Sequence, residues 1–324
     1  METKNFETLK EQTVEVEGRP KKTKDLLPDY YRTLGDGTLE YLGIKTSFEK
    51  LNKATLGLDG LIVLGGLTGV GKTSLALQLA FGASDGHIPT LFYSLEMPRR
   101  AIFTKILNRL ARVRYSDILL KGRQYLTDTQ GQKKLFSDDE AQRLKMGKKL
   151  LEDIGDRFYL RTRERDEQDI TFMTVEQEIN FIKADHKAER VFVVIDHLQV
   201  FDAGDYKDQI DKESKLITGF KGISERTGAV ILLISQKNKA GFTSKGLQTI
   251  KGSVDIVYLA DVVMFLESED EALPEQSEQI DSIIATFGGK VVKPIDLLIA
   301  KNRYNPPVKI KMEFNGEHSE FKEV

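Results

Sequence analysis

The sequence lacks several kinds of residue and segment that would point to particular chemistry. It contains no cysteine, which excludes disulfide bonds, thiolate metal sites and a cysteine nucleophile. It has only four histidines, and none stands at a metal-ligand spacing such as H-x-x-x-H. No apolar stretch approaches the length of a membrane span, and the first residues are polar, unlike a secretory signal. We therefore expect a cytoplasmic protein without a membrane partner.

A strong excess of one charge is also absent. The 48 basic and 50 acidic side chains give a net charge of −2 at pH 7. The overall charge therefore does not indicate nucleic-acid binding, and any basic surface must be local. With 324 residues, of which 40% are hydrophobic, the chain can form one large α/β domain or two smaller ones.

Two parts of the chain differ in composition. Residues 1–40 are rich in Lys, Glu, Asp and Thr, and we expect a polar arm or linker there. Over 41–324, apolar strand-like runs alternate with helical patterns, which is typical of a mostly parallel sheet covered on both faces. Strands are predicted at residues 61–64, 91–95, 191–195, 230–234, 262–266 and 297–300, with an antiparallel addition at 308–314.

Local signals predict where several helices begin and end. Ser137 is followed by three acidic residues, which predicts an N-cap and a helix running to about Ile154. Thr174 forms a capping-box pattern with Gln177 and predicts another helix start. A third helix is expected to end at Gly228.

The most informative segment is a glycine-rich run between a predicted strand and a predicted helix. From Gly66 it matches the phosphate-loop pattern G-x-x-x-x-G-K-[ST]. Such a loop aims several backbone N–H groups and the positive end of a helix dipole at one anionic group. Lys72 is expected to reach the β- and γ-phosphates, and the Thr73 hydroxyl to ligate Mg²⁺. The sequence therefore predicts a nucleoside triphosphate site formed by Gly66, Thr68, Gly69, Val70, Gly71, Lys72, Thr73 and Ser74.

Three polar residues follow apolar strands whose carboxyl ends would share one edge of a parallel sheet. Asp196 is the candidate for the second Mg²⁺ contact. Glu96 could orient and deprotonate the attacking water, or it could only cap the next helix. The amide of Gln236 suits the sensing of a γ-phosphate, because it both donates and accepts hydrogen bonds.

A basic segment follows Gln236 and carries one aromatic residue, Phe242, but no acidic residue as far as Val254. Such a loop is typical of contact with a single-stranded nucleic-acid backbone, although its lysines could equally form a solvated surface. The candidate DNA-binding residues are Lys237, Lys239, Lys245 and Lys251.

The segment Lys301-Asn302-Arg303 follows the last strand of the predicted central sheet. Arg303 could act as an arginine finger in the site of a neighbouring subunit, or it could be an ordinary surface arginine. Both interpretations stay open at the level of spacing.

Taken together, several segments resemble one family. The run GIKTSFEKL at 43–51, the phosphate loop, and the element Ser-Leu-Glu-Met at 94–97 resemble the start of the ATPase domain of DnaB-type replicative helicases. Further matches follow in the family's order. They are IDHLQ at 195–199, SQ at 235–236, ADVVMFL at 260–266, IAKNR at 299–303 and FNGEHSEF at 314–321.

The resemblance implies a RecA-like P-loop NTPase fold, working as a hexameric ring with ATP and Mg²⁺ between subunits. It makes Glu96 the catalytic base and Asp196 the Walker B acid, with Thr73 as the other metal contact. The basic loop would face single-stranded DNA in the central channel. The catalytic set that it implies is Glu96, Lys72, Gln236, Lys301 and Arg303, the last two acting in the neighbour's site.

The chain departs from the family pattern in two places. Family members carry a helical N-terminal domain that organises the ring and binds primase, whereas a polar stretch precedes the ATPase domain here. The family's Arg-Glu-Ser-Gly run is replaced by Lys-Gly-Ser-Val at 251–254. Replication proteins are expected partners of a helicase. The departures keep a second hypothesis open, a RecA-like regulatory or loader ATPase that acts on a protein partner without unwinding DNA.

Overall fold

The structure, a computed structural model, describes residues 22–35, 41–120, 136–163, 170–236, 258–268 and 292–324. The chain divides into two units, Met1–Glu40 and Tyr41–Val324. The described part of the first unit contains helix α1 (Thr23–Gly35), which has Pro28 in its interior. No helix among the described residues is long and apolar enough to cross a membrane.

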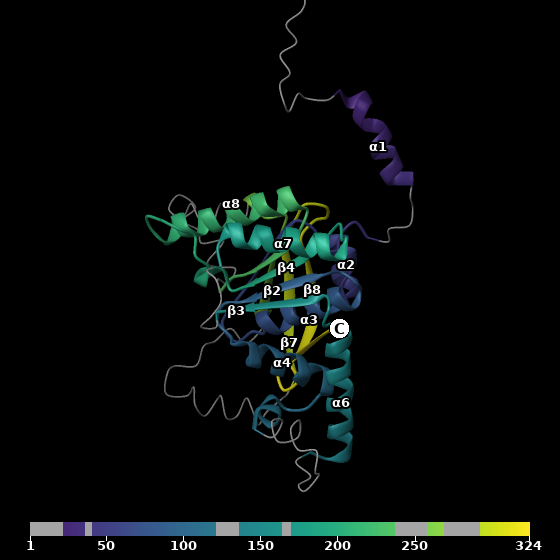
Figure 1. Cartoon of the computed structure of the whole chain (residues 1–324), viewed down its shortest axis with the longest axis vertical. Helices are drawn as coiled ribbons and strands as arrows, with labels where there is room; N and C mark the ends of the chain where they lie inside the picture. The colour runs from purple at the N-terminus through teal and green to yellow at the C-terminus, as the bar shows by residue number, and fades with distance from the viewer. Residues whose placement is uncertain (1–21, 36–40, 121–135, 164–169, 237–257, 269–291) are drawn as a thin grey trace, which may run out of the picture. The chain divides into compact units, whose positions relative to one another are not determined.

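The second unit is built on one twisted sheet (Figure 1). Within the described residues its strand order is β3-β2-β4-β5-β1-β6-β7-β8-β9. The pairs from β3 to β6 in this order are parallel, and the pairs from β6 to β9 are antiparallel. The strands are β1 (Leu61–Gly66), β2 (Thr90–Ser94), β3 (Phe158–Thr162), β4 (Phe192–Asp196), β5 (Val230–Ile234), β6 (Val262–Ser268), β7 (Val292–Asn302), β8 (Val308–Asn315) and β9 (Glu320–Glu323).

Helices cover both faces of this sheet. On one face, α3 and α4 pack against one set of side chains of β1, including Ile62 and Leu64. On the other face, α7 and α8 pack against the alternate set, including Leu61 and Val63. Because successive side chains of a strand point to opposite faces, a fully apolar strand is what this two-sided burial requires. The helices are α2 (Glu49–Thr55), α3 (Lys72–Asp85), α4 (Arg99–Ala111), α6 (Asp138–Asp153), α7 (Phe172–His186) and α8 (Gln209–Thr227), with a short 3₁₀ turn η1 (Leu198–Val200).

This architecture confirms the predicted α/β fold class, with a mostly parallel sheet and antiparallel strands at the C-terminal end. The helix signals were right in two cases. Ser137 forms a reciprocal capping box with Glu140, and Gly228 closes α8 in the left-handed conformation.

The capping box predicted at Thr174 was wrong. The helix begins earlier, and the side chain of Thr171 accepts the hydrogen bond from the Thr174 N–H. A Thr-x-x-Thr pair offers two candidate caps, and the upstream threonine takes the role because its backbone is extended, as an N-cap requires.

Candidate nucleotide-binding and hydrolysis site

The predicted phosphate loop joins the end of β1 to the start of α3, at the carboxyl edge of the parallel strands. Gly71 is the N-cap of α3, with a φ of 102° and no side-chain hydrogen bond to the first turn. A Cβ at Gly71 would lie 2.8 Å from Cζ of Phe321, so only glycine fits this turn. The first N–H groups of α3 are therefore left for an anion rather than for a cap.

Lys72 is buried and folds back over the loop. Its Nζ donates to the carbonyl oxygens of Gly66 at 2.8 Å and Leu67 at 2.7 Å. Burial lowers the pKa of Lys72, and the carboxylates of Asp196 and Glu96 oppose that effect. The ammonium group thus sits in the pocket with a fixed position, where a phosphate can replace its carbonyl partners.

Asp196, the last residue of β4, is buried beside the loop and shares a hydrogen bond with the side chain of Thr73. Burial raises the pKa of Asp196 to about 6, against the lowering effect of the Thr73 hydrogen bond. A carboxylate and a hydroxyl are the hard oxygen ligands that Mg²⁺ prefers, and a cation would offset the cost of burying this charge. The two residues therefore fit the metal predicted for them.

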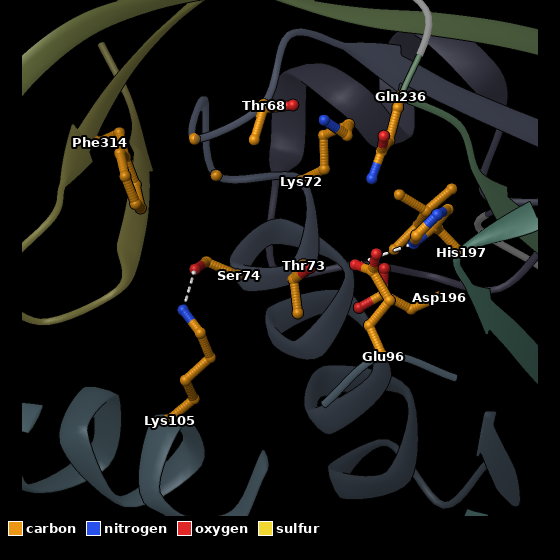
Figure 2. Close-up of a pocket in the computed structure, with 13 residues that line it drawn as sticks. Thr68, Lys72, Thr73, Ser74, Glu96, Lys105, Asp196, His197, Gln236 and Phe314 are labelled. Atoms are coloured by element: carbon orange, nitrogen blue, oxygen red, sulfur yellow. Dashed lines mark hydrogen bonds and ion pairs between the residues drawn. The ribbon is translucent and has the colours of Figure 1, made fainter. Parts of the chain in front are cut away.

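Glu96 lies two residues beyond β2, and its carboxylate approaches both Asp196 and the ring of His197 (Figure 2). The Oε2 atom of Glu96 is 2.9 Å from Nδ1 of His197. Burial lowers the pKa of His197, and the opposing effect of the neighbouring Glu96 carboxylate is smaller. Glu96 therefore has a specific partner in the pocket, and the N-cap of α4 is Pro98 rather than Glu96.

Gln236 follows β5 and is directed toward the same pocket (Figure 2). Its neighbour Ser235 is tied to the 3₁₀ turn after β4, because Nε2 of Gln199 donates to Ser235 Oγ at 3.0 Å. This hydrogen bond directly links the turn after Asp196 to the end of β5 that carries Gln236.

Sequence reasoning missed Ile234, the last residue of β5, and three further residues of this pocket. Besides His197, they are Lys105 of α4, whose Nζ reaches Ser74 Oγ at 3.3 Å, and Phe314 of β8. The position of His197 directly after Asp196 was a usable signal. Lys105 and Phe314 reach the pocket through packing between segments that are distant in sequence, so no local sequence pattern predicts their position. The cavity is lined by Thr68, Gly69, Gly71, Lys72, Thr73, Ser74, Glu96, Lys105, Asp196, His197, Ile234, Gln236 and Phe314.

Two residues of the predicted nucleotide set do not line the cavity. Gly66 supplies a carbonyl to Lys72, and a Cβ there would lie 2.9 Å from the carbonyl oxygen of Leu266. Val70 packs against the core on the α3 face. Both support the loop from behind.

The structure places Lys301 and Arg303 away from this cavity, at the opposite end of β1. The Lys301 Nζ donates to the carbonyl oxygen of Ala260 at 2.6 Å, and an Arg303 nitrogen lies 3.0 Å from Asp261 Oδ1. Asp261 in turn accepts from the Leu61 N–H, at the start of β1, whereas the phosphate loop leaves the end of β1. The predicted DNA-binding residues Lys237, Lys239, Lys245 and Lys251 lie outside the described residues.

Known proteins similar to this chain include replicative helicases. The replicative DNA helicase DnaB of Mycoplasma pneumoniae is 26% identical over 315 residues, an alignment covering 92% of this chain and 60% of the relative. The corresponding protein of Rickettsia prowazekii is 23% identical over 307 residues, covering 86% of this chain and 58% of the relative. The chain therefore spans about 60% of the length of the curated relatives it matches.

Solved structures show the same fold. A structure described as an ATPase domain superposes with a TM-score of 0.73 at 19% identity, covering 93% of this chain and 98% of the other. A DnaB-like replicative helicase, solved in a study of its interactions with primase, gives 0.69 at 18% identity, covering 93% of this chain and 67% of the other. These likenesses confirm the RecA-like fold. A family model described as "DnaB-like helicase C terminal domain" matches residues 43–323, so this chain belongs to that family.

Proposed function

We propose that the protein hydrolyses ATP with Mg²⁺ and uses the energy to translocate along single-stranded DNA as a hexameric helicase. One observation carries the hydrolysis part of the proposal. The phosphate loop, Asp196, Glu96 and Gln236 come from four separate segments and line a single cavity. A storage or purely structural protein has no need of this convergence.

Each residue of this set has a task in phosphoryl transfer. Lys72 and the N–H groups at the start of α3 bind the phosphates, and Thr73 with Asp196 would hold Mg²⁺. The metal, when bound, neutralises negative charge on the phosphates. Glu96 accepts a proton from the attacking water, and Gln236 senses whether a γ-phosphate is present.

The assembly part of the proposal is supported by Lys301 and Arg303. They lie at the end of β1 that is far from their own phosphate loop, so a nucleotide within their reach would be bound by an adjacent copy. An arginine supplied in this way stabilises the charge of the transition state. The family relationship supports the same ring arrangement and makes single-stranded DNA and other replication proteins the expected partners.

Steady-state ATP hydrolysis, measured with and without single-stranded DNA, tests this function, with Lys72→Ala as the blank. Strong stimulation by DNA, followed by unwinding of a forked duplex, is the expected result. Robust hydrolysis that ignores DNA would overturn the motor assignment and favour a regulatory or loader ATPase with a protein partner. Equal rates for the wild type and Lys72→Ala would overturn the enzyme assignment itself.

A further inference from the structure

We propose that His197 is a positioning residue that holds Glu96 in the orientation needed to activate the attacking water. The inference rests on the proposed ATP hydrolysis and adds to it a residue that the sequence did not indicate. His197 lines the cavity, and Figure 2 shows its ring directed toward the Glu96 carboxylate.

The backbone brings the two side chains together. Ser94 and Asp196 are partners in the parallel pairing of β2 with β4, and the Leu95 N–H donates to the Asp196 carbonyl at 2.6 Å just beyond it. Glu96 and His197 follow directly on their own segments. The register of two adjacent strands therefore sets the Glu96–His197 distance before any side-chain contact is made.

The two partners differ in freedom. The side chain of His197 is 5% exposed and that of Glu96 is 51% exposed. A half-exposed glutamate samples several rotamers, whereas a buried ring has one orientation. Because the ring of His197 is fixed, its 2.9 Å hydrogen bond to Glu96 restricts the exposed carboxylate to one orientation.

The bond also leaves the carboxylate able to act. Nδ1 of His197 is assigned as the donor, because an ionised carboxylate can only accept a hydrogen bond. The ring engages only Oε2 of Glu96, and no described residue donates to Oε1. One carboxylate oxygen is oriented by the protein and the other is left to accept a proton from water.

Three variants separate the donor from the ring. His197→Phe keeps the ring volume and removes the donor. His197→Asn can place an amide N–H where Nδ1 stands, whereas His197→Gln places it where Nε2 stands. If the donor at Nδ1 matters, Asn should retain activity that Phe and Gln lose.

The measurement is kcat and KM for ATP on the whole chain, alongside the Kd of a fluorescent ATP analogue. We expect His197→Phe to lower kcat by about 10- to 100-fold, with KM and Kd within about twofold of wild type. His197→Asn should recover most of kcat and His197→Gln should not. In a Glu96→Gln background, His197→Phe should have no further effect on kcat.

Equal kcat for the Asn and Gln variants would overturn the inference, as would a rise in basal hydrolysis on removing the donor, because the histidine would then restrain Glu96. If His197→Phe does not fold, the Asn and Gln pair still decides. The proposed function fails separately, when the wild type hydrolyses no more ATP than Lys72→Ala.

Discussion

Arg303 is anchored twice to Asp261. Its guanidinium lies 3.0 Å from the buried Asp261 carboxylate, and its backbone N–H donates to the Asp261 carbonyl at 3.1 Å. The same carboxylate accepts from Lys221 Nζ at 2.8 Å and from the Leu61 N–H at 2.8 Å. The contacts with Asp261 fix the position of Arg303, while the Arg303 side chain remains 57% exposed to solvent.

The first prediction concerns this fixed and exposed arginine. Arg303→Ala should reduce ATP turnover by about 10³- to 10⁵-fold while leaving the Kd for ATP nearly unchanged, because the lost charge acts only on the transition state. Arg226→Ala is the matched control, since Arg226 is an equally exposed arginine paired with Glu176 on the surface. When Arg303→Ala is doped into wild-type protein, activity should fall faster than the fraction of wild type. A simple dilution curve would contradict a role in a neighbour's site.

The second prediction concerns stability. Asp261→Ala removes the buried carboxylate that accepts from the Leu61 N–H and pairs with Lys221, whose remaining partner is the exposed Glu225 at 3.3 Å, and we expect a loss of about 3–5 kcal/mol in the free energy of unfolding. Glu176→Ala, which breaks a surface pair with Arg226, should cost less than about 1 kcal/mol. Denaturant titration of both variants measures the difference. Equal costs would show that Asp261 is not a structural anchor.

The third prediction concerns pH and uses metal-free protein in EDTA. Because burial raises the pKa of Asp196 to about 6, the folded state binds a proton more tightly than the unfolded state, whose pKa is near the ordinary 3.8. The contribution of Asp196 to stability is therefore fully present below about pH 4 and is lost as the pH rises through about 6. At about pH 7.5 the buried charge should cost about 2–3 kcal/mol.

Asp196→Asn should thus unfold at higher denaturant concentration than wild type at about pH 7.5, and the gap should narrow toward about pH 4.5. A gap that is constant with pH would mean that the Asp196 charge is not the cause. The same variant should lose ATP turnover, because an amide is a poorer Mg²⁺ ligand than a carboxylate.

The fourth prediction rests on sequence alone. Replacing Lys237, Lys245 and Lys251 by Ala should weaken single-stranded DNA binding and reduce the slope of log K against log salt by about two. The triple variant Lys145→Ala, Lys148→Ala and Lys149→Ala removes the same charge from exposed positions of α6 and is the control. If both triple variants bind alike, the basic loop does not contact DNA.

The sequence predicted the core on both faces of the sheet well. The central strands are uninterrupted apolar runs, and a strand that is apolar at every position must be covered on both faces. It did not predict β3, a five-residue edge strand with Arg161 among its three half-buried positions. An edge strand is less covered than a central strand and therefore needs fewer apolar residues. The apolar pattern of β3 is consequently too short to be distinguished from a loop.

The site divides in the same way. Asp196, Glu96 and Gln236 could be placed together from sequence because parallel strands end at one edge. Lys105 could not, because it reaches the cavity only through the packing of α4 beside the phosphate loop. Phe314 could not either, because the pairing of β8 in the antiparallel extension determines its location.

The opposite placement of the phosphate loop and Arg303 along β1 has a consequence for symmetry. A subunit that receives an arginine at one end of the strand and offers one at the other has two chemically distinct faces. An isologous dimer joins a face to itself, so it would leave both arginines without a nucleotide. If Arg303 serves a neighbour's site, only heterologous, head-to-tail repetition employs every Arg303, and the repetition must either close into a ring or continue as an open helix. The polarity of one buried strand would then give the whole assembly its direction.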